Sequence, residues 1–264
     1  MDYYSTSLAT FLALTLVYYM VGKPMVSMEE AARDYATKEK ELGTYARLAM
    51  YFCLVVTFQY IGNVLYMGSL CGGNIGGNIG AATLYTFLPW IFVFGIMAAA
   101  LLSYPGLKNA FADVLGYAVV AWSAHDLMSR ILRPKDAEGT SAAAATLIER
   151  VAGNVGLLVN DMHPDTFHAK WEQLRALMTP EATAADSPLK EALYALVVRK
   201  DNVGEASWLI ATALFTSSLV FYLMSTHRCV KDAATIKKEH EAYLASLPPP
   251  PPPAPQEDAE PEPW

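Results

Sequence analysis

The chain has 264 residues, of which 53% are hydrophobic and only 17% are charged, and its formal net charge is −7 at pH 7. Its mean hydropathy is positive, a property that soluble domains seldom show. The apolar residues are gathered into blocks about as long as the roughly 20 residues that a helix needs to cross a bilayer. The composition therefore excludes an ordinary soluble domain and predicts an all-α, multi-pass helical membrane protein.

Four apolar blocks predict about four transmembrane helices, each with Tyr or Trp where an interfacial belt of aromatic side chains is expected. The blocks are residues 7–21, 48–70, 81–104 and 206–226. None of them contains Asp, Glu, Lys or Arg, whereas ion pathways and proton relays usually place ionisable groups inside the bilayer. The four spans therefore favour anchoring over transport.

The N-terminal segment, residues 1–22, is expected to be an uncleaved membrane anchor. A cleaved signal peptide is the alternative, but no Lys or Arg precedes the apolar block and no A-x-A site follows it at a suitable distance. Residues 23–47 predict an amphipathic surface helix that extends the second span. In this segment Ser27 is followed three residues later by Glu30, which is a capping-box pattern.

Residues 48–132 predict a membrane helical hairpin that is followed by an interfacial segment. That segment, 109–124, includes Asp113 and is short for a span. We expect it to be a helix that lies on the membrane or packs against the other helices.

Residues 133–205 predict a small helical extramembrane domain. Three amphipathic helical patterns occupy 143–158, 164–178 and 188–200. A domain of about 70 residues is close to the lower limit for a self-sufficient core. We therefore expect it to be stabilised by contact with a neighbour or with the membrane.

The last transmembrane helix is predicted at 206–228, and a polar helix follows it at 229–247. Residues 248–264 predict a disordered, proline-rich acidic tail, because six consecutive prolines favour an extended polyproline II conformation and the acidic end cannot build a core. A proline-binding partner could dock on this tail, but a passive tail is the simpler interpretation.

The distribution of basic residues predicts the topology. Five Lys and Arg residues lie between 23 and 47 and ten more between 106 and 204. The opposite side receives the bare N-terminus, the loop after the second span and four basic residues after the last span. By the positive-inside rule the first two segments face the cytosol, so both chain ends share the non-cytosolic side.

The stretch CGGNIGGNIG at 71–80 separates the second and third spans. It lacks the Lys of a P-loop and a preceding strand, so no phosphate site is expected. A selectivity filter would need a second glycine-rich segment or an acidic ring, and neither is evident. The repeated glycines instead predict a tight turn or close helix packing, and they are Gly72, Gly73, Gly76, Gly77 and Gly80. The asparagines between them could hydrogen-bond the backbone that the glycines leave exposed.

The densest polar cluster contains Asp161, His163, Asp165 and His168. Its histidines are spaced H-x-x-x-x-H, which does not place both imidazoles on one helical face, so no metal site is expected. No nucleophile elbow, pair of catalytic carboxylates or Cys–His arrangement can be assembled with any specificity. The sequence therefore predicts no enzyme, no catalytic residue and no cofactor.

The three cysteines lie at informative positions. Cys53 falls inside the second span and is expected to be a buried, small apolar residue. Cys71 and Cys229 each lie at a membrane exit, and the predicted topology puts both exits on the same side. They either form a disulfide that links the second and third spans to the fourth, or remain two unpaired thiols.

Several stretches carry a family resemblance. They are CGGNIGGNIGAATLYTFLPWIFVFG at 71–95, SYPGLKNAFADVLGY at 103–117, KDNVGEASW at 200–208 and CVKD at 229–232. Over residues 48–246 the chain resembles a structural inner-membrane protein family of nucleocytoplasmic large DNA viruses, the giant viruses of algae and protists. The chain departs from the family pattern at Tyr104 and Leu107, where the family more often has Phe and an aromatic or basic residue.

The resemblance implies a structural virion protein of the inner lipid membrane, made in host endomembranes, that links this membrane to the capsid shell. It implies contacts with the lipid bilayer, with minor capsid or other membrane proteins of the virion and with further copies of the chain, but not with nucleic acid. Viruses of this kind commonly carry a thiol oxidase, so the resemblance also favours a Cys71–Cys229 bridge. A channel or transporter-like membrane protein is the alternative function.

Overall fold

The computed structural model describes residues 3–23, 28, 38–135, 142–184 and 186–247. Most of the predicted surface helix at 23–47, with its capping box at Ser27 and Glu30, lies outside the described residues, as does the proline-rich tail at 248–264. The described elements are helices, with one isolated β-bridge between Leu132 and Met178.

Four helices are long and apolar enough to cross a membrane, so the chain is an all-α, multi-pass helical membrane protein, as the composition predicts. They are Tyr3–Gly22, formed by α1 (Tyr3–Val17) and the π-helical turn η1 (Tyr18–Gly22); Tyr45–Leu70, within α3 (Lys38–Leu70); Ile75–Ser103, formed by α4 (Ile75–Pro89), η2 (Trp90–Gly95) and α5 (Ile96–Ser103); and α12 (Pro188–Ser225). Pro89 has no N–H to donate, and the π turn after it lets the third span continue as a helix.

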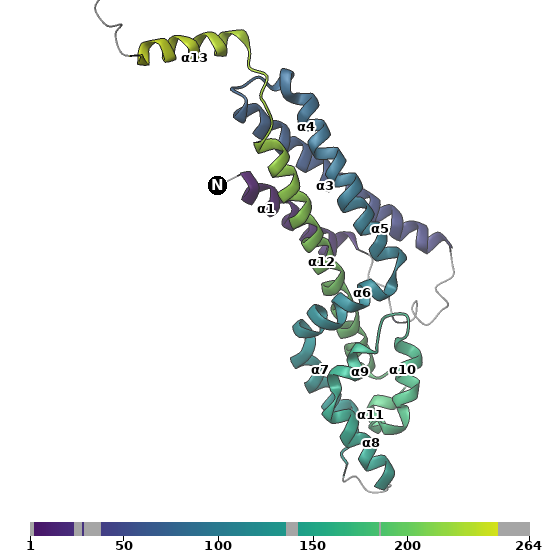
Figure 1. Cartoon of the computed structure of the whole chain (residues 1–264). Helices are drawn as coiled ribbons and strands as arrows, with labels where there is room; N and C mark the ends of the chain where they lie inside the picture. Colours follow the sequence, from purple (N-terminus) through teal and green to yellow (C-terminus); the bar gives the residue numbers. More distant parts are fainter. Residues whose placement is uncertain (1–2, 24–27, 29–37, 136–141, 185, 248–264) are drawn as a thin grey trace, which may run out of the picture.

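The four spans run in alternating directions. Tyr3 at the start of α1 stacks on Tyr66 near the end of α3, with ring centroids 3.9 Å apart, and lies beside Phe221 near the end of α12. The start of α1, the turn between α3 and α4 and the end of α12 therefore share one end of the bundle (Figure 1). This is the relative arrangement that the charge distribution predicts.

A first core lies inside the bundle and receives aromatic and branched side chains from all four spans. Its buried members include Phe11, Tyr51, Val55, Trp90, Phe94, Leu209, Ala213 and Val220. Polar side chains within the bundle pair across helices: Ser7 donates to Gln59, and Asn63 Nδ2 donates to Thr86 Oγ1 at 2.7 Å. Such pairs stabilise helix contacts where lipid offers no hydrogen-bond partner.

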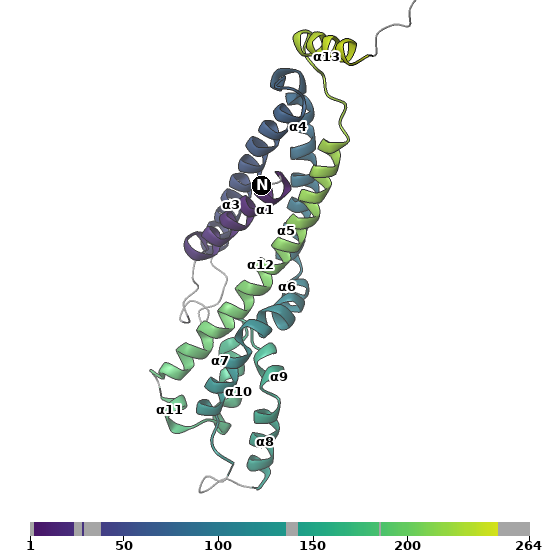
Figure 2. The ribbon, with the colours of Figure 1, turned by 90° about the vertical axis from the view of Figure 1, so that its left-hand side faces the viewer.

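A helical domain lies at the other end of the bundle (Figure 2). Its elements are α6 (Pro105–Phe111), the π turn η3 (Ala112–Gly116), α7 (Tyr117–Ile131), α8 (Ala142–Gly153), α9 (Val155–Asn160), α10 (Phe167–Leu174), the 3₁₀ turn η4 (Arg175–Leu177), α11 (Pro180–Thr183) and the first half of α12. A second core joins α7, α9, α10 and α12, and includes Val120, Met128, Ile131, Val159, Phe167, Trp171, Leu193 and Val197.

The packing shifts two predicted domain boundaries. Val120, Ala124 and Ile131 of α7 are buried in the second core, so α7 belongs with the extramembrane domain rather than with the hairpin at 48–132. The predicted boundary between 205 and 206 falls inside α12, which is one helix of 38 residues. A single glycine, Gly204, does not end a helix whose neighbours pack on both sides.

The polar helix predicted at 229–247 is shorter in the structure. α13 (Ala233–Ser246) begins where the Asp232 carboxylate accepts a hydrogen bond from the Thr235 N–H at 3.1 Å. It contains no buried residue and lies beyond the end of the bundle in both views (Figures 1 and 2).

The second core can be tested with one buried and one exposed side chain. Trp171→Ala is expected to lower the free energy of unfolding by about 3–5 kcal/mol, because this indole is only 2% exposed. Leu157→Ala is the control, since Leu157 is 71% exposed, and should change stability by less than about 0.5 kcal/mol. Thermal unfolding of the detergent-solubilised protein measures both, and equal shifts would contradict this core.

Candidate functional site

A disulfide closes the end of the bundle that carries the start of α1. Cys71 follows the last residue of α3, Cys229 lies between α12 and α13, and their Sγ atoms are 2.04 Å apart. The bond joins residues separated by 158 positions, so it fastens the second and third spans to the fourth. This is one of the two alternatives that the sequence left open. Cys53, by contrast, was expected to be buried but is exposed on the outside of α3, where the surrounding lipid is itself apolar.

Two asparagines reinforce the disulfide. Asn74 Nδ2 and Asn78 Nδ2 each donate to the Val230 carbonyl at 2.9 Å, and the Val230 N–H donates to Asn78 Oδ1 at 3.0 Å. Asn74 Oδ1 also accepts from the Gly77 N–H at 3.0 Å and so caps α4. Both the N–H and the carbonyl of Val230 are therefore hydrogen-bonded. We call this arrangement the disulfide clamp: Cys71, Asn74, Asn78, Cys229 and Val230.

The glycines of this stretch have separate roles. Gly72 and Gly73 have φ values of 69° and 89°, a left-handed conformation that favours glycine, and they make the turn between α3 and α4. A Cβ on Gly76 or Gly80 would meet no atom within 4 Å. The turn is therefore as predicted at Gly72 and Gly73, whereas close helix packing within the chain does not occur at Gly76 or Gly80. A Cβ on Gly77 would lie 2.6 Å from Asn74 Nδ2, so this glycine makes room for the cap.

A group of ionisable side chains lies at the other end of the bundle, where α12 passes into the extramembrane domain. Lys200 is completely buried, and its Nζ donates to Asp113 Oδ1 at 2.9 Å and to the carbonyls of Val159 and Asn160 at 3.2 and 3.1 Å. The three N–H groups of this ammonium thus each have an acceptor, which is the condition under which a charge can be buried.

The neighbouring carboxylates of α12 are paired as well. Asp201 pairs with Lys108 of α6 at 2.5 Å, and Glu205 pairs with Lys23 at 2.9 Å. Glu205 Oε1 also accepts from the Tyr19 hydroxyl at 2.9 Å. We call these pairs the charged junction: Lys23, Lys108, Asp113, Lys200, Asp201 and Glu205. The junction ties the N-terminal anchor, α6 and η3 to α12.

Two glycines bring the backbones together at this junction. A Cβ on Gly116 would lie 2.1 Å from the Lys200 carbonyl oxygen, and a Cβ on Gly204 would lie 2.5 Å from the Cα of Ala112. Only a residue without a side chain fits at either position. The π turn η3 occupies this contact, and π turns are often found where a helix serves a special packing or functional need.

Sequence reasoning did not find the charged junction. The absence of charge delimits the predicted spans, so Lys200, Asp201 and Glu205 fall in the predicted extramembrane domain and their partners in separate segments. A signal was present, because Lys108 and Asp113 follow the third span while Lys200 and Asp201 precede the fourth. Matching these opposite charges across the two membrane exits would have suggested the pairs.

In the polar cluster at 160–168, Asn160 contacts Lys200 and Asp113, whereas Asp161 and His163 make local contacts. Asp161 pairs with Lys170, and the His163 N–H donates to Thr166 Oγ1 at 3.0 Å. Burial and the nearby Lys200 ammonium lower the pKa of His163 below its usual value. No group of three or more His, Cys, Asp or Glu side chains among the described residues could hold a metal ion.

Comparison with protein-family models, curated proteins and solved structures finds no match to this chain. The stretches that carry the viral resemblance supply most of both sites: residues 71–80 and Cys229 form the disulfide clamp, while 103–117 and 200–208 supply most of the charged junction.

The disulfide clamp is tested by Cys71→Ser. Wild-type protein is expected to change mobility in a denaturing gel when it is reduced, and the variant is not. In a chain-entropy description, a bond across 158 positions contributes at most about 5 kcal/mol, so the variant should also unfold at a lower temperature. Cys53→Ser is the control and should keep both properties of the wild type. A wild-type chain without a reduction-dependent shift would contradict the bond.

The backbone contact at the junction is tested by Gly116→Ala. The added Cβ must displace the Lys200 carbonyl, so we expect a loss of about 1–3 kcal/mol of unfolding free energy. Gly106→Ala in α6 is the matched control, because a Cβ there meets no atom within 4 Å. Thermal unfolding in detergent compares the two variants, and a Gly116→Ala protein as stable as the control would refute the close approach.

Proposed function

We propose that the chain is a structural virion membrane protein that links the viral inner lipid membrane to the capsid shell. The observation that carries this proposal is that α12 contributes side chains to both hydrophobic cores. Leu193 and Val197 of this helix lie in the core of the extramembrane domain, and Leu209, Ala213 and Val220 lie in the core of the membrane bundle. A force on the domain would therefore be transmitted to the bundle through continuous helix rather than through a linker.

The ends of α12 support the same role. The charged junction fixes the helix where it leaves the bundle for the domain, and the disulfide clamp fixes the chain just beyond its other end. Removing one partner of a buried ion pair typically costs about 3–5 kcal/mol, because the other charge is left uncompensated. Such a junction resists separation of the two parts, which suits a protein that holds a membrane at a fixed place.

Transport is less well supported by the same residues. Several of the polar side chains inside the bundle that could line a path are engaged with one another, such as Ser7 with Gln59, Thr15 with Tyr51 and Asn63 with Thr86. The acidic and basic groups at the junction are paired. The family resemblance adds the location, a virion inner membrane, and the partners, minor capsid proteins.

Crosslinking mass spectrometry on purified particles of a virus that encodes the chain tests the proposal. Lys135 on the domain side and Lys237 on the clamp side are 56% and 78% exposed in their side chains, so both can react. We expect lysines on one side of the membrane to crosslink to capsid proteins and those on the other side not to. Absence of the chain from particles, or an absence of capsid crosslinks from both sides, would contradict the proposal.

A further inference from the structure

The helix formed by η3 and α7 has an exposed face that changes character along its length. The first part is apolar: Val114, Leu115, Val119 and Trp122 are 68%, 45%, 55% and 91% exposed. The continuation of this face is polar and exposed, with Ser123, Asp126, Ser129 and Arg130. The change is abrupt, because Trp122 and Ser129, or Val119 and Asp126, are seven residues apart and so lie on the same side of the helix.

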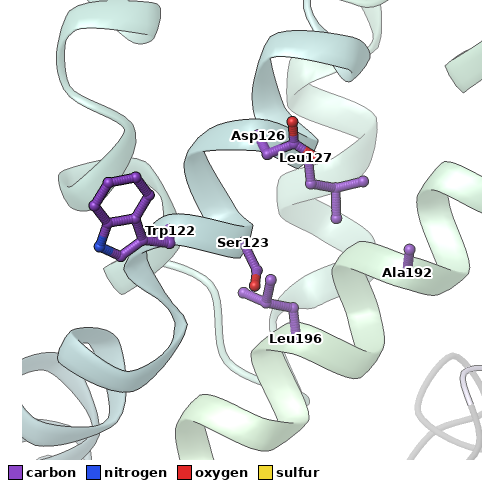
Figure 3. A pocket seen from close by; sticks show the side chains of 6 residues that line it. All are labelled: Trp122, Ser123, Asp126, Leu127, Ala192 and Leu196. Atoms are coloured by element: carbon purple, nitrogen blue, oxygen red, sulfur yellow. The ribbon is translucent and has the colours of Figure 1, made fainter.

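The apolar part of this face has no cover within the described chain. Figure 3 shows the indole of Trp122 pointing away from α12, whereas Ser123 lies toward Leu196. The groove between the two helices, of about 490 Å³, is lined by Ser123, Asp126 and Leu196 and lies beside the indole. An indole left almost wholly in water forgoes about 2–3 kcal/mol that burial of a large apolar side chain would supply. Some other surface is expected to cover it.

The apolar face begins at the level of the membrane boundary. Gly204 is in contact with Ala112, the first residue of η3, and the adjacent Glu205 is the last ionisable residue before the apolar half of α12. The exposed side of η3 and early α7 therefore adjoins the bilayer surface.

We propose that Val114, Leu115, Val119 and Trp122 lie in the interfacial layer of the leaflet on the domain side, and that Trp122 marks the depth at which α7 leaves the lipid. Trp prefers this layer because its ring is apolar and its N–H can bond to water or headgroups. A lipid surface accounts for the polarity change along a single face, since the environment itself changes with depth. A protein partner would not require the change to begin at the membrane boundary.

The proposal is independent of any role in a capsid and is tested in vesicles. On a Cys53→Ala background with the disulfide intact, Val119→Cys and Asp126→Cys provide matched labelling sites on one helix face. Each variant is labelled with bimane maleimide and reconstituted into phosphatidylcholine vesicles, with or without lipid that carries a nitroxide on acyl carbon five. The label at position 119 is expected to lose most of its emission to the nitroxide, and the label at position 126 to keep it.

A third variant, Leu115→Cys, fixes the direction of the gradient. Position 115 is nearer to the bundle along the helix, so its label is expected to be quenched at least as strongly as that at 119. Strong quenching at 126, or emission that survives at both 115 and 119, overturns the proposal. The second of these results would instead favour a protein that covers the apolar face. An unfolding temperature in detergent equal to that of the Cys53→Ala parent verifies that each labelled variant is folded, and a non-reducing gel verifies that the Cys71–Cys229 bond is intact.

Discussion

The crossing of η3 with α12 is the contact on which the arrangement of the chain depends. Gly116 and Gly204 remove the side chains that would separate the two backbones, and the close approach brings Lys200 to Asp113 and to the last two carbonyls of α9. The charge can be buried only because the backbones are this close, and the backbones stay close because the buried charge would lose its partners if they moved apart. Neither feature would be stable alone.

The disulfide clamp stabilises the end of the bundle that lies opposite the charged junction. Between helices in a bilayer there is no hydrophobic driving force, so association depends on packing, hydrogen bonds and covalent links. The chain leaves α12 without regular secondary structure at residues 227–232, where its backbone groups need partners. Asn74 and Asn78 satisfy those of Val230, and the Cys71–Cys229 bond prevents the segment from leaving.

Composition and charge were sufficient to predict the spans, their alternation and that Cys71 and Cys229 lie at the same end of the bundle, because these follow from bilayer thickness and from the exclusion of charge. The continuity of α12 was not predicted, since its first half is amphipathic and its second half is apolar all round, and the change in pattern resembles a boundary. The partners of Lys200 and of Asn78 lie 87 and 152 residues away in sequence. Periodicity describes one helix at a time and does not indicate such contacts.

The charged junction and the disulfide clamp act on the same helix, α12. This combination explains why ionisable residues are absent from the apolar parts of the four spans but concentrated at one exit. A charge within the bilayer would cost stability without adding specificity, whereas at the junction it selects a single register between α12 and η3. With the register fixed at one end and the clamp closing the other, α12 cannot slide or rotate without breaking an ion pair or straining the disulfide. A protein built in this way is suited to holding two surfaces at a constant separation, which is the requirement of a link between a membrane and a shell.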